Sequence, residues 1–259
     1  MRQIEVKGLV LRTVDVSESD RMLTLYTEEM GLVSAYARGS RSLKSRKMSS
    51  TQQFCYATFM LRERSDKYWI DEAVLTESFF GLRDNLAGLA LAGYIAEVLT
   101  DVGTAEPERE LLRLALNSLY AISNNKAELW KIKGAFELRC AAIIGFLPDV
   151  ISCHTCGTGE GEFFFDIMAG AIECTECHKK REAFGEVLSD IHESHIIYQL
   201  SRGAKVALGY CLYAPIEKLF SFTIGNSDIR LFEKAAEGYL LNHLERGFKT
   251  LDFYNEVRE

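Results

Sequence analysis

The chain has 259 residues and a net charge of −7, with 47% hydrophobic and 26% charged side chains. This length favours two or three domains, and the composition is that of an ordinary soluble globular protein rather than a disordered or fibrous one. No stretch approaches the 18 or more apolar residues of a membrane span, and the apolar run at 8–11 is too short for a signal peptide, so we expect a cytoplasmic protein.

Charge is unevenly distributed along the chain. Residues 1–80 carry 12 Lys+Arg and 11 Asp+Glu, a balance of +1, whereas residues 81–259 have a balance of −8. Five cations fall within ten residues that contain no acid: Arg38, Arg41, Lys44, Arg46 and Lys47. The net charge argues against wholesale coating of nucleic acid, but this segment is typical of a loop that contacts phosphates. The alternative is a merely solvated loop.

The first 80 residues contain the pattern of five short strands and no strong helical period. We predict strands at 4–11, 23–26, 32–37, 53–62 and 68–75, with a hairpin loop at 28–31 in which Gly31 takes positive φ. Five strands in so short a segment favour a small closed barrel, most economically an OB-fold, over residues 1–80.

Aromatic side chains on these strands are candidates for stacking on unpaired bases, each contributing about 1–3 kcal/mol. The candidates are Tyr36, Phe54, Tyr56, Tyr68 and Trp69. Any single aromatic residue in a small barrel belongs to the core more often than to a binding surface. The five cations therefore carry the prediction of a nucleic-acid site, and the aromatics are secondary.

Helical periodicity follows from Gly81 onward. Apolar residues recur at helical spacing over 86–98, 111–119 and 127–144, and Pro148 ends the third helix. Helical pattern resumes near Ser189 and runs in segments to Asn255. We therefore predict a helical domain in two parts, 81–150 and 185–259, interrupted by an insertion at 151–184.

The insertion contains two Cys-x-x-Cys pairs, Cys153 with Cys156 and Cys174 with Cys177, separated by 17 residues. Two such turns bring four thiolates into a tetrahedral shell that suits one structural zinc ion and leaves no open position for catalysis. Gly157, Gly159 and Gly161 supply backbone freedom, and two short strands at 162–166 and 170–173 complete a zinc ribbon.

Other readings of the cysteines and histidines stay open at this stage. The two pairs could form disulfides or remain buried thiols, and His154 or His178 could replace a cysteine as ligand. The remaining cysteines, Cys55, Cys140 and Cys211, stand in apolar contexts and suit the core of a protein in a reducing compartment.

Several local strings accompany this order of parts: VKGLVLR at 6–12, DRMLTLYT at 20–27, GLVSAYARGSR at 31–41, FELR at 136–139, GFLPD at 145–149, YLLNHLER at 239–246 and KTLDF at 249–253. Together with the cysteine spacing, they resemble the RecO family of bacterial recombinational repair proteins over nearly the whole chain. Some members of that family lack the cysteines, so the metal is not essential to the shared function.

The resemblance implies a nucleoid-associated, non-enzymatic recombination mediator. Such a protein binds single- and double-stranded DNA and anneals complementary strands. With RecR, it helps load RecA onto DNA coated by single-stranded-DNA-binding protein. The sequence agrees with a non-enzymatic role in that it lacks catalytic motifs: the five histidines form no triad spacing, and no G-x-x-x-x-G-K-[ST] loop is present.

Two alternatives belong to other functional classes. One is a zinc-containing protein–protein adaptor that does not bind DNA directly, which would show no salt-sensitive DNA affinity. The other is a redox enzyme that uses Cys-x-x-Cys, which needs a low-pKa thiol at a helix N-terminus beside a βαβ unit.

Overall fold

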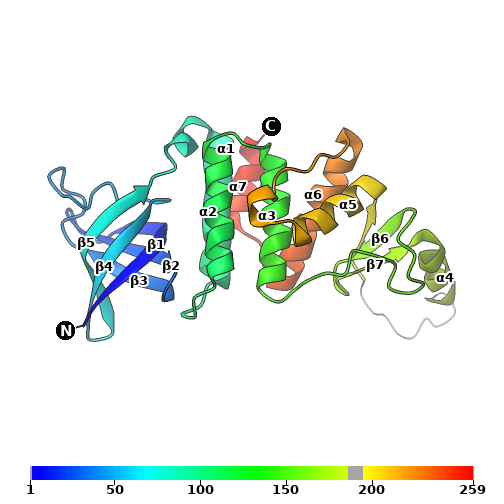
Figure 1. Cartoon of the computed structure of the whole chain (residues 1–259), viewed down its shortest axis with the longest axis horizontal. Helices are drawn as coiled ribbons and strands as arrows, with labels where there is room; N and C mark the ends of the chain where they lie inside the picture. Colours follow the sequence, from blue (N-terminus) through cyan, green and yellow to red (C-terminus); the bar gives the residue numbers. More distant parts are fainter. Residues whose placement is uncertain (1, 186–194, 259) are drawn as a thin grey trace. The chain divides into compact units, whose positions relative to one another are not determined.

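The computed structural model describes residues 2–185 and 195–258 (Figure 1). The chain divides into two compact units: residues 1–125 together with 248–259, and residues 126–247. Each unit has its own core. The domain boundaries predicted from the sequence at 80, 150 and 184 stay predictions.

Five strands at the start of the first unit close into a barrel in the order β1-β2-β3-β5-β4. Their bounds are β1 Arg2–Asp15, β2 Arg21–Thr27, β3 Gly31–Ala37, β4 Tyr56–Arg64 and β5 Lys67–Glu77. Neighbouring strands are antiparallel except β3 and β5, which pair in parallel. The predicted five-stranded barrel is confirmed.

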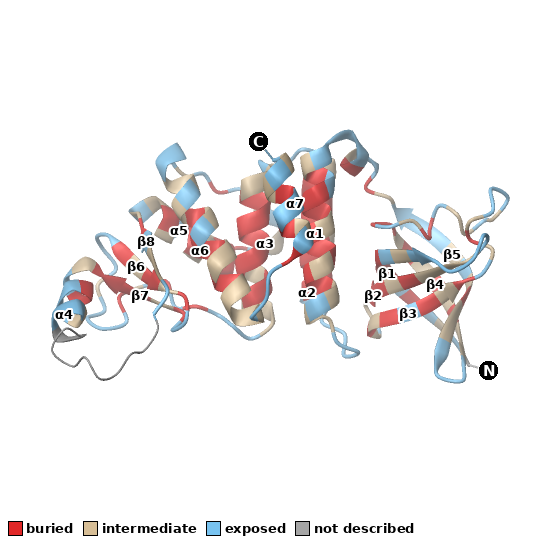
Figure 2. Cartoon of the chain, turned by 180° about the vertical axis from the view of Figure 1, so that it is seen from behind, coloured by how far each residue is buried: buried red, intermediate tan, exposed pale blue. Residues whose placement is uncertain are grey.

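The barrel interior is filled by alternate residues of every strand, because successive side chains in a strand point to opposite faces. Figure 2 shows these buried positions in red. The core cluster contains Val6, Val10, Leu23, Leu25, Val33, Ala35, Ala37, Cys55, Ala57, Phe59, Leu61 and Ile70.

Two local features test the strand predictions. Gly31 has φ +60°, as predicted, and a Cβ there would lie 2.2 Å from the Thr104 carbonyl oxygen, so only glycine fits. The fourth strand begins at Tyr56 rather than at Gln53, so its predicted start is wrong. Phe54 has φ +67° and its amide donates to the Val10 carbonyl oxygen, so the chain is still turning there.

Helices complete the first unit: η1 Phe80–Asp84, α1 Leu86–Val102, α2 Arg109–Ser123 and α7 Lys249–Val257. Asn85 caps α1, because its side chain accepts a hydrogen bond from the Gly88 amide. The C-terminal helix α7 packs on α1, with the rings of Tyr94 and Phe248 edge to face at 5.6 Å.

The second unit combines helices with a small sheet. Its helices are α3 Leu129–Ile143, α4 Thr175–Gly185, α5 Arg202–Tyr213, η2 Ile216–Lys218 and α6 Asn226–Leu244. Helix α3 packs against α5 and α6, and it is buried on nearly every side. Among the residues that the structure describes, no helix is long and apolar enough to cross a membrane.

The sheet has the antiparallel order β7-β6-β8, with β6 Phe163–Asp166, β7 Ala171–Cys174 and β8 Ile197–Leu200. The ribbon hairpin predicted at 162–166 and 170–173 is confirmed. The helical pattern predicted from Ser189 is wrong at 197–200, where β8 pairs with β6, and its first residues lie outside the described part of the chain. Tertiary pairing overrides local periodicity at this position.

Candidate metal centre and nucleic-acid interface

The four predicted cysteines meet at one end of the small sheet. Cys153 and Cys156 lie in the loop after β-bridge residue Asp149, Cys174 ends β7, and Cys177 lies in the first turn of α4. All four Sγ atoms lie within 4.8 Å of one another, and those of Cys156 and Cys174 are 3.7 Å apart. Each Cys-x-x-Cys pair therefore contributes two thiols to one cluster.

Local hydrogen bonds form the first knuckle. The Gly157 amide donates to the Cys153 carbonyl oxygen at 2.8 Å, and the Cys153 amide donates to the Thr158 carbonyl oxygen at 2.8 Å. Gly157 and Gly161 have φ +77° and +105°, conformations that glycine adopts without strain. Gly159 does not adopt such a conformation.

The sulfur geometry fits a four-thiolate metal site. Zinc–sulfur bonds of about 2.3 Å in a tetrahedron place the sulfurs about 3.8 Å apart, close to the 3.7 Å observed. That distance is far longer than the roughly 2 Å of a disulfide bond, and all the cysteines are free thiols. Three of the four cysteines are buried and Cys156 is exposed. These residues therefore can hold a metal ion.

The thiols differ in acidity. Burial opposes ionisation of Cys153, but hydrogen bonds from the backbone at residues 174, 156 and 155 outweigh it and lower its pKa to about 6. Burial and hydrogen bonds with the other three thiols raise the pKa of Cys177 to about 12. A cation at the centre would favour the thiolate form of all four side chains, because metal binding to cysteine releases the thiol proton.

The neighbouring histidines do not belong to this group of ligands. His154 is exposed, while the ring of His178 stacks on Phe164 at 3.8 Å. Arg181 shares a hydrogen bond of 3.0 Å with Nδ1 of His178 and donates to Glu173 at 2.9 Å. Both histidines thus lie near the centre without entering it.

The geometry disfavours the redox alternative. Cys177 does lie at the N-terminus of a helix, α4, which the sequence analysis did not predict. However, the pKa of Cys177 is raised, and Cys153, whose pKa is lowered, lies in a loop rather than at a helix N-terminus. The adjoining sheet is also antiparallel rather than part of a βαβ unit.

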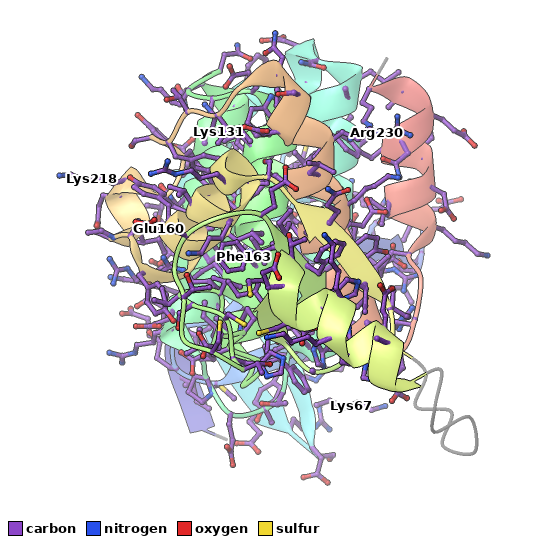
Figure 3. The ribbon with its side chains drawn as sticks, turned by 90° about the vertical axis from the view of Figure 1, so that its right-hand side faces the viewer. Lys67, Lys131, Glu160, Phe163, Lys218 and Arg230 are labelled. Atoms are coloured by element: carbon purple, nitrogen blue, oxygen red, sulfur yellow. The ribbon has the colours of Figure 1, made fainter. Side chains whose placement is uncertain are left out.

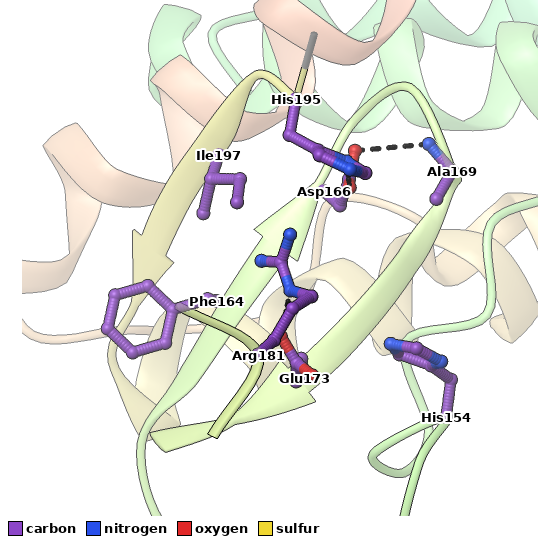
Figure 4. Close-up of a pocket in the computed structure, with 8 residues that line it drawn as sticks. All are labelled: His154, Phe164, Asp166, Ala169, Glu173, Arg181, His195 and Ile197. Carbon is purple, nitrogen blue, oxygen red and sulfur yellow. Dashed lines mark hydrogen bonds and ion pairs between the residues drawn. The ribbon is translucent and has the colours of Figure 1, made fainter. Parts of the chain in front are cut away.

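Beside the centre, the outer face of the sheet carries a cavity of about 100 Å³ (Figure 4). Each carboxylate that lines it has a hydrogen-bond partner: Asp166 shares a hydrogen bond with His195, and Glu173 accepts one from Arg181. Phe163 at the start of β6, labelled in Figure 3, faces the opposite way, with the Lys205 ammonium 4.6 Å from its ring. Because these carboxylates already have partners within the protein, we assign the cavity no ligand.

The five predicted cations of the first unit lie in a segment of consecutive turns between β3 and β4. Amide hydrogen bonds link Ser42 to Gly39, Ser45 to Ser42 and Met48 to Ser45. The segment is therefore a folded, turn-rich surface rather than an extended loop.

Two of these cations anchor the segment to the barrel. Arg41 donates to the Ser17 carbonyl oxygen at 2.6 Å and pairs with Asp15 at 3.2 Å. Lys47 donates to the Ile70 carbonyl oxygen at 3.0 Å, and burial lowers the pKa of its ammonium. These contacts limit how far either side chain can reach outward.

The other three cations are exposed. Within residues 2–185 and 195–258, the side chains of Lys44 and Arg46 have no ion pair or hydrogen bond. Arg38 lies with its guanidinium carbon 4.3 Å from the ring centroid of Trp69, and Trp69 stacks on Tyr36 at 4.7 Å with planes 22° apart. The sequence analysis named all three members of this stack but did not predict their contact.

The remaining stacking candidates have other roles. Phe54 is buried and Tyr68 packs against the barrel core. Tyr56 is half-buried and donates to Glu28, and burial together with that hydrogen bond raises the pKa of Tyr56. Tyr36 and Trp69 are the two of these five candidates that stack on each other.

Comparison with known proteins decides the family. The family profile described as "Recombination protein O N terminal" matches residues 1–79, and that described as "Recombination protein O C terminal" matches residues 83–192. The DNA repair protein RecO of Acetivibrio thermocellus is 30% identical over 255 residues, which cover 98% of this chain and 96% of that relative. The chain belongs to the RecO family.

Further members of the RecO family support the assignment. DNA repair protein RecO of Thermoanaerobacter sp. is 27% identical over 259 residues, covering 100% of this chain and 99% of its own. That of an Anaeromyxobacter species is 37% identical over 181 residues, covering 68% and 70%. The resemblance seen in the sequence is thus confirmed, and the protein belongs to a family of recombination and DNA repair proteins.

Proposed function

We propose that this protein binds single- and double-stranded DNA through residues 38–47 of its barrel, called the basic segment below, and acts as a recombination mediator. In this role it anneals complementary strands and, with RecR, helps load RecA onto DNA coated by single-stranded-DNA-binding protein. Membership of the RecO family supports the role. The observation that supports DNA binding is the exposure of Lys44 and Arg46, which follow Arg38 in the same segment. Their side chains have no ion partner in the described chain.

The five cations of the basic segment fall into two groups with different roles. Arg41 and Lys47 hold the turns against the barrel, so Arg38, Lys44 and Arg46 stand on a preformed surface. Phosphates recur every few ångströms along a strand, and each cation that meets one releases condensed counterions. A preformed surface loses less conformational entropy on binding than a disordered loop would.

The proposal includes one zinc ion held by Cys153, Cys156, Cys174 and Cys177. Four thiolates at tetrahedral spacing match the ligand preference of zinc and leave no position for a reacting water, which supports a structural role. The centre joins the 151–161 loop, β7 and α4. The proposed role involves no covalent chemistry, and a protein acting on the chromosome would work in the cytoplasm, associated with the nucleoid.

The test is an anisotropy titration of the full-length protein with single strands of random sequence at two salt concentrations. The double variant Lys44→Ala/Arg46→Ala should weaken binding to every sequence. It should also flatten the dependence of log affinity on log salt by about 0.7 for each single-strand phosphate that the variant no longer neutralises. The matched control is Lys179→Ala/Lys180→Ala, which removes two exposed cations from α4 and should leave both quantities unchanged.

A contrary result would identify the competing function. If the unmodified protein has no salt-sensitive affinity for DNA, the barrel is a structural unit and the protein is a zinc-containing adaptor. If both double variants bind as tightly as the parent, the basic segment is only a solvated turn. A reduction confined to one base sequence would indicate direct base readout instead.

A further inference from the structure

A continuous row of large apolar side chains crosses the barrel from strand to strand. Val14 of β1 lies opposite Met22 of β2, Met22 lies opposite Tyr36 of β3, and Tyr36 lies opposite Trp69 of β5. Directly opposed residues in neighbouring strands share one face of a sheet. These four residues, called the outer row below, therefore form one strip across four strands.

The strip lies on the outside of the barrel. The residues next to it along the strands are Leu23, Ala35 and Ile70, and all three belong to the barrel core. Because side chains alternate between the two faces of a strand, the outer row points away from that core. Val14 is 45% exposed, and Met22, Tyr36 and Trp69 are half-buried.

Cations flank the aromatic end of the row. The Arg38 guanidinium lies over the Trp69 ring at 4.3 Å. Arg62 of β4 lies opposite Trp69, but it is paired with Asp71 at 2.6 Å. Arg38, the first cation of the basic segment at residues 38–47, is exposed and can meet a phosphate.

We propose that the outer row is a stacking platform for unpaired bases, and that it makes the protein select single strands over duplex. This inference rests on the proposed DNA-binding function and extends it. A base takes the place of the Arg38 guanidinium over the Trp69 ring, and Arg38 then meets the adjacent phosphate. Met22 and Val14 continue the apolar surface along which the strand lies.

The selectivity follows from the chemistry of stacking. Every unpaired base has a free aromatic face, so a flat aromatic surface binds single strands with little regard to sequence. In a duplex, each face is already covered by the next base pair, and only the phosphates remain for the basic segment. The platform therefore adds affinity for single strands alone.

Tryptophan fluorescence of the full-length protein tests this directly. The chain has two tryptophans, so Trp130→Phe leaves Trp69 as the only one. This variant is titrated with an oligothymidine strand, an abasic strand of equal length and a blunt duplex. We expect the oligothymidine to quench Trp69 emission in step with binding, and the abasic strand and duplex to bind without quenching.

Affinity measurements separate stacking from charge. Trp69→Ala should weaken oligothymidine binding about tenfold or more, while leaving abasic-strand affinity and the salt slope unchanged. Trp69→Phe, which retains a ring, should recover most of that affinity. The control is Val74→Ala, which removes a 66% exposed apolar side chain from β5 outside the outer row and should have no effect.

The results that overturn the inference are distinct from those that overturn DNA binding. One contrary result is that oligothymidine and abasic strands bind with equal, salt-sensitive affinity and do not quench Trp69. This result would show that the outer row binds no bases, and it would leave the row as a surface for protein. No salt-sensitive binding of any strand would reject the proposed function as well. The quenching experiment retains Trp69, so it decides the question even if Trp69→Ala fails to fold.

Discussion

A methyl group added at Gly134 of α3 would lie 2.4 Å from the Cε1 atom of Phe232 on α6. Phe232 is fully buried, and its ring is held by edge contacts with Trp130 at 6.0 Å and Phe222 at 5.4 Å. The ring therefore has little room to move aside. The close packing of α3 on α6 depends on glycine at this position.

We predict that Gly134→Ala lowers the free energy of unfolding by about 1–3 kcal/mol, because overpacking outweighs the better helix propensity of alanine. The control is Gly93→Ala in α1, where a Cβ would meet nothing nearer than Thr250 Cγ2 at 3.9 Å. That substitution should raise the free energy of unfolding by up to about 1 kcal/mol. Urea denaturation measures both, and stabilisation by Gly134→Ala would contradict the packing argument.

The cysteine cluster should hold one zinc ion per chain in protein purified without chelator. Cys174→Ser should release the metal and lower thermal stability, because metal binding contributes to folding. Cys211→Ala, at a buried cysteine outside the cluster, should retain the metal. Elemental analysis and a thermal melt check both variants. Absence of stoichiometric metal in the parent, or intermolecular disulfides in its place, would count against the structural zinc site.

Lys133 forms a buried ionic cluster, with Nζ 2.8 Å from Glu137 and 2.7 Å from Glu237. Burial opposes its charge, but the two carboxylates outweigh burial and raise the pKa of Lys133. Lys133→Met should cost about 3–5 kcal/mol of unfolding free energy, because it leaves the fully buried Glu137 without its cation.

The double variant Lys133→Met/Glu137→Leu distinguishes pairing from packing. Removing both charges together should recover much of the stability that Lys133→Met removes, since no uncompensated buried charge remains at 137. A double-mutant cycle by chemical denaturation measures this coupling. Simple addition of the two single effects would show that the ion pair is not the cause.

His243 makes the second unit sensitive to acid. Its ring stacks on Phe146 at 4.5 Å, and burial lowers its pKa. Because the folded pKa is below the unfolded value of about 6.5, the stability from this residue is fully present above that pH. It is lost as the pH falls through the folded pKa. His243→Phe should therefore reduce the fall in unfolding free energy between about pH 7.5 and about pH 5.5. An unchanged pH dependence would exclude His243 as its source.

Local patterns in the sequence were sufficient to predict several features of the structure. The spacing of Cys153, Cys156, Cys174 and Cys177 predicted one cluster, because each pair forms its own turn and a hairpin brings the two pairs together. Alternating residues predicted the barrel strands, because burial of one face has a period of two. The positive φ of Gly31 followed from the hairpin loop. Such features depend on neighbours within a few residues or on one hairpin.

Contacts between distant segments required the tertiary structure. Helical periodicity near residues 197–200 was misleading, because β8 is decided by its pairing with β6 about thirty residues earlier. Phe54 alternates like a strand residue, yet a turn before β4 buries it. The basic segment was visible as a run of cations. Which of them anchor it, as Arg41 and Lys47 do, depends on the carbonyl oxygens of Ser17 and Ile70.

The sequence alone therefore determined the family, the barrel and the four-cysteine cluster, since each depends on short-range spacing or on the order of parts along the chain. Which residues form the outer row was decided by the tertiary fold. Trp69 meets Tyr36 because β3 and β5 pair in parallel to close the barrel, and their register places two residues 33 positions apart on one face. A closed sheet fixes such pairs through backbone hydrogen bonds, and no periodicity in the chain encodes which side chains will lie opposite each other.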